Sequence, residues 1–98
     1  MQKPFSIVGG ARIGWTGFSW PLARLSATSN ELVIKVLFDA YTFAPGDVVA
    51  IDRHKGIFSR GIRIRHQVTA YPENIIFWSN PEKAFGSIRD SGFVAAAG

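Results

Sequence analysis

The stretch from residue 74 to residue 93 reads NIIFWSNPEKAFGSIRDSGF, and it decides how the fold ends. Its first part, residues 74–79, is a compact run of β-forming side chains. Asn80 can then cap a helix, and Pro81 suits the first helical position because its missing N–H needs no partner there. Gly92 fits the left-handed residue that follows many helices. This stretch therefore predicts a last strand followed directly by one helix.

The predicted helix has a single apolar stripe, formed by Ala84, Phe85 and Ile88. Such a stripe packs a helix against the rest of a domain. Glu82 lies in the first turn, where the helix dipole favours a negative charge. Phe93 is expected to contact Ile88, as in the apolar pair of a Schellman motif. We therefore expect the helix to cover one side of the preceding strands.

The residues before this stretch alternate like strands. In residues 21–28, Ala23, Leu25 and Ala27 share one face. Ser29 and Asn30 then form a tight turn. In the following run, one face is expected to hold four apolar residues: Leu32, Ile34, Val36 and Phe38. The two runs and their turn predict a β-hairpin.

Further strands are predicted on both sides of residue 53. Pro45 and Gly46 have the signature of a type II turn between two strands in residues 41–52. Residues 53–56, RHKG, are expected to form the next turn. Gly61 lies inside the strand that follows and indicates a bulge or bend.

The order of elements predicts the fold class: mainly β with one C-terminal helix. Six to seven strands are expected to form an antiparallel barrel or bent sheets that the helix caps. No strand–helix alternation occurs, which argues against a parallel α/β sheet. The 98 residues fit one domain. Residues 1–19 are rich in glycine and without clear period, so we expect them to pack on a domain formed by residues 20–98.

Four segments resemble the bacterial PH-like and GRAM-like domains of the pleckstrin-homology superfold. They are PLARLSATSNELVIKV (21–36), YTFAPGDVVAID (41–52), GIRIRH (61–66) and YPENIIFWS (71–79). The resemblance implies a non-enzymatic scaffold that binds phosphoinositides, peptides or other proteins, with some members forming rings. Its lipid-binding members usually place Lys and Arg around the first hairpin turn. Residues 28–31, read as that turn, are Thr-Ser-Asn-Glu and carry no basic residue, which argues against phosphoinositide binding of the usual kind.

Composition narrows the function classes. The net charge is +4, a mild excess that favours anionic partners without requiring one. Hydrophobic residues make up 47% and charged residues 18%, so the chain is expected to fold and to expose apolar surface to a partner or to itself. There is no cysteine, which excludes disulfides and thiolate chemistry. MQKPFSIVGG is too short and glycine-rich for a signal peptide, so we expect a cytoplasmic protein, with peripheral membrane attachment as an alternative.

Catalytic and metal motifs are not found. The glycines at 10, 14 and 17 do not match a dinucleotide-binding fingerprint, and no phosphate-binding loop or nucleophile elbow occurs. Asp47 and Asp52 lie five residues apart on one predicted strand, so they face opposite sides. Two histidines without cysteine or spaced carboxylates do not make a metal site. We therefore expect no enzyme activity, no metal and no cofactor.

The two histidines differ in their surroundings. His66 is in phase with Ile62 and Ile64 on the predicted core face, where a neutral, hydrogen-bonded structural role is expected. His54 lies in the predicted 53–56 turn and is expected to be solvated. Among the aromatic residues, Phe77 and Trp78 alternate, so at least one of the two rings is expected to face solvent or a partner.

The candidate binding residues are basic and surround residue 60. They are Arg53, His54, Lys55, Arg60, Arg63 and Arg65. Arg63 and Arg65 point to the same side of their strand. Two interpretations stay open: one positive surface that binds an anion, or an exposed strand face kept soluble by charge.

The sequence thus favours a binding or adaptor domain without chemistry of its own. The expected partner is another protein or a second copy in a homo-oligomer. One alternative is peripheral binding to an anionic membrane through residues 53–65. A small nucleic-acid-binding barrel ranks lower, and a small-molecule substrate is not expected.

Overall fold

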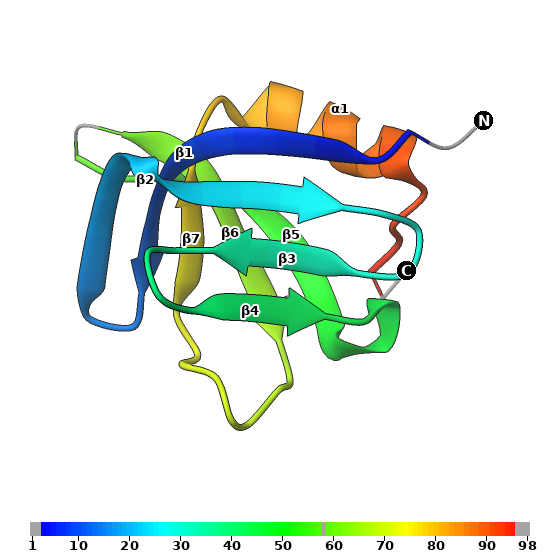
Figure 1. Ribbon diagram of the computed structural model, residues 1–98, viewed down its shortest axis with the longest axis horizontal. Helices are drawn as coiled ribbons and strands as arrows, with labels where there is room; N and C mark the ends of the chain where they lie inside the picture. The colour runs from blue at the N-terminus through cyan, green and yellow to red at the C-terminus, as the bar shows by residue number, and fades with distance from the viewer. Residues whose placement is uncertain (1–2, 58, 96–98) are drawn as a thin grey trace.

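The structure, a computed structural model, describes residues 3–57 and 59–95. The outer ends of the predicted ranges 1–19 and 20–98 lie outside the described residues. Within them, seven strands form one antiparallel sheet and a helix follows (Figure 1). The elements are β1 (Phe5–Ile13), β2 (Thr16–Ala27), β3 (Leu32–Lys35), β4 (Ala40–Phe43), the 3-10 helix η1 (Pro45–Asp47), β5 (Val48–Lys55), β6 (Arg60–His66), β7 (Ile75–Trp78) and α1 (Pro81–Ser91).

The sheet has the strand order β4-β3-β2-β1-β7-β6-β5 and curls into a half-barrel (Figure 1). The helix α1 packs against β1 and β6 and covers one side of the curl. The predicted fold class is therefore confirmed: mainly β, with seven antiparallel strands and a C-terminal helix. This arrangement is compatible with the pleckstrin-homology superfold.

The central strand β1 lies in the segment where the sequence showed no period. It pairs with β2 on one side and with β7 on the other. Its glycines allow this close approach: a Cβ atom on Gly9 would lie 2.5 Å from the Trp78 carbonyl oxygen, and one on Gly10 would lie 2.7 Å from the Phe18 carbonyl oxygen. The register with β2 shifts between Gly9 and Ala11. Because Gly9 and Gly10 have no side chains, the alternation of apolar and polar residues that would have predicted a strand is missing here.

The predicted hairpin is present as β2 and β3. Its inward residues are buried: Ala23, Leu25, Ala27, Leu32, Ile34 and Val36. The prediction for Phe38 was wrong, because β3 ends at Lys35 and the Phe38 side chain is 95% exposed. The chain turns there, with the Val36 N–H donating to the Asp39 carbonyl oxygen at 2.9 Å.

Three local predictions around the middle of the chain need correction. Pro45 and Gly46 lie in a 3-10 turn instead of a type II turn, and the Asp47 carboxylate accepts from the Ala44 N–H at 2.9 Å. Residues 53–55 are the end of β5, so the turn begins only at Gly56. Gly61 is not a bulge, since its pairing with β5 and β7 is continuous.

The helix begins and ends at the signals in the sequence. The Asn80 side chain accepts from the N–H groups of Glu82 and Lys83, at 3.0 and 3.4 Å. Gly92 has a φ of 86°, and its N–H donates to the Arg89 carbonyl oxygen at 3.1 Å. The helix contributes Ala84 and Ile88 to the core, and the segment after it contributes Phe93. Strand residues of the core include Ala11, Ile13, Leu25, Leu32, Ile34, Phe43, Val48, Ile62, Ile64, Ile75 and Phe77.

Candidate functional site

The six predicted basic residues lie on the hairpin of β5 and β6. In its register, Arg53 faces the buried Ile62 and His54 faces Gly61. Because successive side chains of a strand point to opposite faces, the six do not make one surface. They divide into Arg53, Lys55 and Arg60 on the core side, and His54, Arg63 and Arg65 on the outer side.

Two of these cations have carboxylate partners. Arg53 donates to Glu82 of α1 at 2.9 Å, and its guanidinium carbon lies 5.5 Å from the centre of the Phe85 ring. Arg65 donates to Asp52 at 2.6 Å. Among the described residues, Arg63 forms no ion pair, and its buried Nε has no hydrogen-bond partner. The predicted patch is thus partly neutralised where it lies in the sheet.

His66 is half-buried at the end of β6 and is bonded through both ring nitrogens. The Val68 N–H donates to Nδ1 at 3.1 Å, so Nδ1 carries no proton. Nε2 then donates to the Pro72 carbonyl oxygen at 2.9 Å. The ring also packs against Phe43, with 5.0 Å between ring centres. His66 therefore ties the β6–β7 loop to the end of the strand.

The outer face of β1, β7, β6 and β5 carries a second set of candidate side chains. Arg12 of β1 and Arg63 of β6 flank Ile76 of β7 in register. Ile76 is only 2% exposed, although it does not belong to the main core cluster. Long arginine side chains can cover such a residue with their aliphatic parts. The neighbouring row across these strands is Gly10, Trp78, Gly61 and His54.

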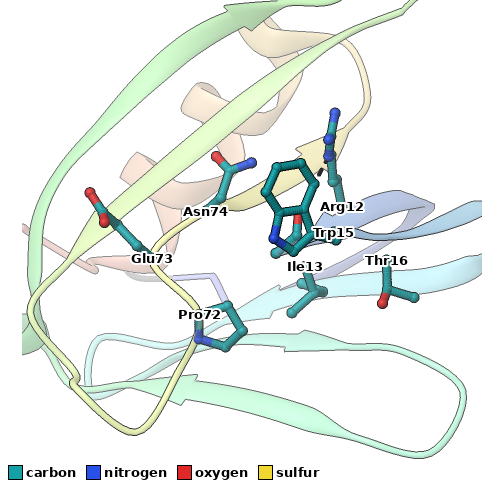
Figure 2. A pocket seen from close by; sticks show the side chains of 8 residues that line it. Arg12, Ile13, Trp15, Thr16, Pro72, Glu73 and Asn74 are labelled. Atoms are coloured by element: carbon teal, nitrogen blue, oxygen red, sulfur yellow. Dashed lines mark hydrogen bonds between the residues drawn. The ribbon is translucent and has the colours of Figure 1, made fainter.

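Two hollows meet at Arg12. The first has a volume of 440 Å³ and lies between the β1–β2 turn and the β6–β7 loop. Figure 2 shows the side chains of Arg12 and Trp15 beside each other, with those of Glu73 and Asn74 across from them. The Gly14 N–H donates to the Asn74 carbonyl oxygen at 2.7 Å, which holds the turn against the loop.

The second hollow has a volume of 370 Å³ and is named the Trp78 hollow after its largest lining side chain. It extends from β1 to the β5–β6 turn. Its lining residues are Arg12, His54, Gly56, Ile57, Ser59 and Trp78. None of them is acidic, so the polar groups that line it suit an anion better than a cation.

A third feature is the end of the molecule where the hairpin turns gather. The β1–β2, β3–β4 and β5–β6 turns lie at the same end of the long axis, on the left in Figure 1. Each turn carries a large apolar side chain that is almost fully exposed: Trp15 (94%), Phe38 (95%) and Ile57 (91%). Trp20, Leu22 and Leu37 are also exposed. Leu37 lies in the β3–β4 turn, whereas Trp20 and Leu22 lie in β2. We call the four turn residues, Trp15, Leu37, Phe38 and Ile57, the apolar turn end.

The sequence did not single out most of these residues. Arg12 and Trp15 lie in the glycine-rich segment without period, and Phe38 was assigned to the core. At least one of Phe77 and Trp78 was expected to face solvent or a partner. The structure buries Phe77 and leaves Trp78 partly exposed on the outer face. The missing signal was the position of the turns, which the strand pattern alone did not give.

Comparison of the chain with protein-family models, with curated proteins and with solved structures found no match. Within the described residues, no helix is both long and apolar enough to cross a membrane. In the same part of the chain, no group of three or more His, Asp or Glu side chains is placed to hold a metal ion.

Proposed function

We propose that this chain is a non-enzymatic, PH-like binding domain that attaches peripherally to an anionic membrane surface through its apolar turn end. The observation that carries the proposal is the placement of Trp15, Phe38 and Ile57. Three separate turns present one large apolar side chain each, at one end of the molecule. In the free domain these three side chains stay in contact with water, whereas insertion of this end into a membrane interface would remove part of each from water.

The free energy gained by inserting these side chains is large enough to support reversible membrane binding. Full burial of a large apolar side chain contributes roughly 1.5–3 kcal/mol, and insertion to the depth of the interface buries part of each. Tryptophan such as Trp15 is favoured at the headgroup level because its ring is amphipathic. Several shallow insertions together give reversible binding.

Basic residues beside the turns add attraction to an anionic surface. Lys35 ends β3, and Lys55 and Arg60 pair at the ends of β5 and β6. Within the described residues, none of these three forms an ion pair. Each cation close to an anionic surface contributes about 1 kcal/mol at most and less in high salt. The basic segment 53–65 thus supports binding through its turn, while its strand residues Arg53 and Arg65 are paired.

The first hairpin turn also differs from the one that the sequence suggested. The first hairpin of the chain is β1–β2, whose turn contains Gly14 and Trp15 and follows Arg12. Residues 28–31, which carry no basic residue, connect β2 and β3 and so belong to the second hairpin. Their lack of positive charge does not count against lipid binding at the first hairpin turn, where lipid-binding PH-like domains usually carry Lys and Arg.

Co-sedimentation with vesicles tests this function. The wild-type chain is expected to bind phosphatidylcholine vesicles that contain phosphatidylserine, and to bind less as salt is raised. The triple variant Trp15→Ser/Phe38→Ser/Ile57→Ser is expected to stay in the supernatant. Val94→Ser is the matched control, since Val94 is exposed but follows the helix. Equal binding of the triple variant and the control would refute the proposal.

The second candidate is a protein interface, which is the function that the sequence favoured. Leu37 follows Val36 into the same turn as Phe38, and Trp20 and Leu22 of β2 are exposed as well. This further exposed apolar area favours contact with another protein surface. Light scattering over a range of concentrations tests self-association. A dimer that the triple variant reduces to a monomer, without vesicle binding by the wild type, would assign the apolar turn end to protein contact.

A further inference from the structure

The Trp78 hollow is separate from the apolar side chains of the β1–β2 and β3–β4 turns. Its floor is set by the Trp78 indole, which spans the outer face between two glycines. A Cβ atom on Gly10 would lie 3.3 Å from Cδ1 of the indole, and one on Gly56 would lie 3.1 Å from Cη2. Glycine at both positions leaves the Cδ1 and Cη2 edges of the indole without a Cβ neighbour, and part of the ring lines the hollow.

Arg12 supplies a cation at the β1 side of this hollow. Its side chain is exposed and forms no ion pair with the described residues. The one hydrogen bond of its guanidinium there is a long one, from Nε to the Gly14 carbonyl oxygen at 3.4 Å. The terminal nitrogens of Arg12 are therefore available to a ligand, and a guanidinium binds carboxylate and phosphate oxygens in a bidentate manner.

His54 supplies a polar group at the β5 side. Its ring centre lies 5.5 Å from that of Trp78, at an interplanar angle of 55°. In the described part of the chain its ring nitrogens have no hydrogen-bond partner. Arg12 and His54 thus lie on either side of an aromatic floor, and none of the described residues that line the hollow carries a carboxylate.

We infer that the Trp78 hollow binds a small ring-bearing oxyanion, whose planar ring stacks on Trp78 and whose carboxylate or phosphate group bonds to Arg12. His54 donates to or accepts from the polar end of the same ligand. A volume of 370 Å³ is at the small end of ligand sites, which fits a compact molecule of one or two rings. Ile57 lines this hollow and also belongs to the apolar turn end, but Arg12, His54 and Trp78 carry the ligand contacts, so ligand binding does not rest on membrane attachment.

Nuclear magnetic resonance titration of the full chain tests the site. The probes are phenyl phosphate and benzoate, with benzyl alcohol as a ring without an oxyanion and inorganic phosphate as an oxyanion without a ring. At least one of the first two is expected to shift the Trp78 indole N–H and the Arg12 Nε–H signals, with a dissociation constant of about 1 mM or lower. No shift with either, or equal binding of a single-feature probe, would overturn the inference.

Two variants that each remove one positive charge distinguish ligand binding at Arg12 from a general effect of net charge. Arg12→Gln is expected to weaken probe binding about tenfold or more, because it removes a charged hydrogen-bonding group. Arg89→Gln on α1 makes the same charge change far from the hollow and is expected to bind like the wild type. Equal losses in both variants would contradict the site. Trp15→Ser/Phe38→Ser is expected to retain probe binding even where vesicle binding is lost, so the two proposals fail independently.

Discussion

The Gly61 backbone on β6 lies directly against the Phe77 carbonyl oxygen on β7. A Cβ atom at residue 61 would overlap that oxygen and approach the Trp78 Cα to 3.0 Å. Gly61 and Trp78 are paired in register, and Trp78 also pairs with Gly10, so the contact lies in one row across β6, β7 and β1. Glycine is required there by close packing of two backbones, while the φ angle of Gly61 is ordinary.

Gly61→Ala is expected to destabilise the fold strongly. The added methyl group meets a backbone atom that cannot rotate away, so β6 and β7 must separate, at a cost of about 3 kcal/mol. Urea denaturation measures the change in the free energy of unfolding. Gly17→Ala is the matched control, because a Cβ atom there has no neighbour within 4 Å, and its effect should stay within about 0.5 kcal/mol. Equal stability of the two variants would contradict the close approach.

Asn80→Ala is expected to destabilise the helix at its start. Loss of the side-chain oxygen leaves the Glu82 and Lys83 N–H groups without their cap, which costs about 1 kcal/mol. For a domain of this size the melting temperature should fall by roughly 4–8 °C. Asn30→Ala, in the β2–β3 turn, is the comparison, since Asn30 caps no helix. A smaller fall than in Asn30→Ala would argue against the capping role.

His66→Phe tests the link between β6 and the following loop. Phenylalanine keeps an aromatic ring beside Phe43 but offers no acceptor to the Val68 N–H and no donor to Pro72. We expect a loss of about 1–3 kcal/mol and faster hydrogen exchange of the Val68 amide. His54→Phe should leave that amide unchanged. Unchanged exchange in His66→Phe would show that the loop is held by other contacts.

The raised pKa of Tyr41 predicts that the folded state loses stability at alkaline pH. Burial raises the pKa of Tyr41 above its ordinary value of 10.0, and the charges of Asp39 and Tyr71 raise it further. The folded state therefore keeps the phenol proton at a pH where the unfolded chain has lost it. This contribution is fully present below pH 10.0 and is lost as the pH rises through the folded value.

Melting temperatures measured below and above pH 10.0 test whether Tyr41 ionisation destabilises the folded state. The wild type is expected to lose stability above pH 10.0, and Tyr41→Phe is expected to lose less. Absorbance titration of the phenolate should also show a lower pKa for Tyr41 in Asp39→Asn. An identical alkaline decline in wild type and Tyr41→Phe would place its cause elsewhere.

The parts of the fold that could be predicted are those specified by neighbouring residues. Asn80 and Gly92 mark the helix because caps act within one turn of the chain. The β2–β3 hairpin follows from alternation and a short turn. The strand β1 was missed because Gly9 is explained by the approach of Trp78, far along the sequence, and Gly10 by the approach of Phe18 across a turn that was not predicted.

The candidate site was less predictable for the same reason. Arg63 and Arg65 were placed on one side of their strand, but only the pairing with β5 shows that Asp52 neutralises Arg65 and that Arg53 points to the other face. Arg12 and Trp78 meet across β1 and β7, which are separated by most of the chain.

By itself, the sequence determined the fold class, the capped helix and the inward face of its hairpin, because these depend on local propensity and periodicity. Only the tertiary structure decided which glycines allow two backbones to touch, which arginines are paired, and which aromatic rings are exposed together at the turns. These properties depend on register and curvature, and no residue fixes them alone. They arise when seven strands close into one curled sheet.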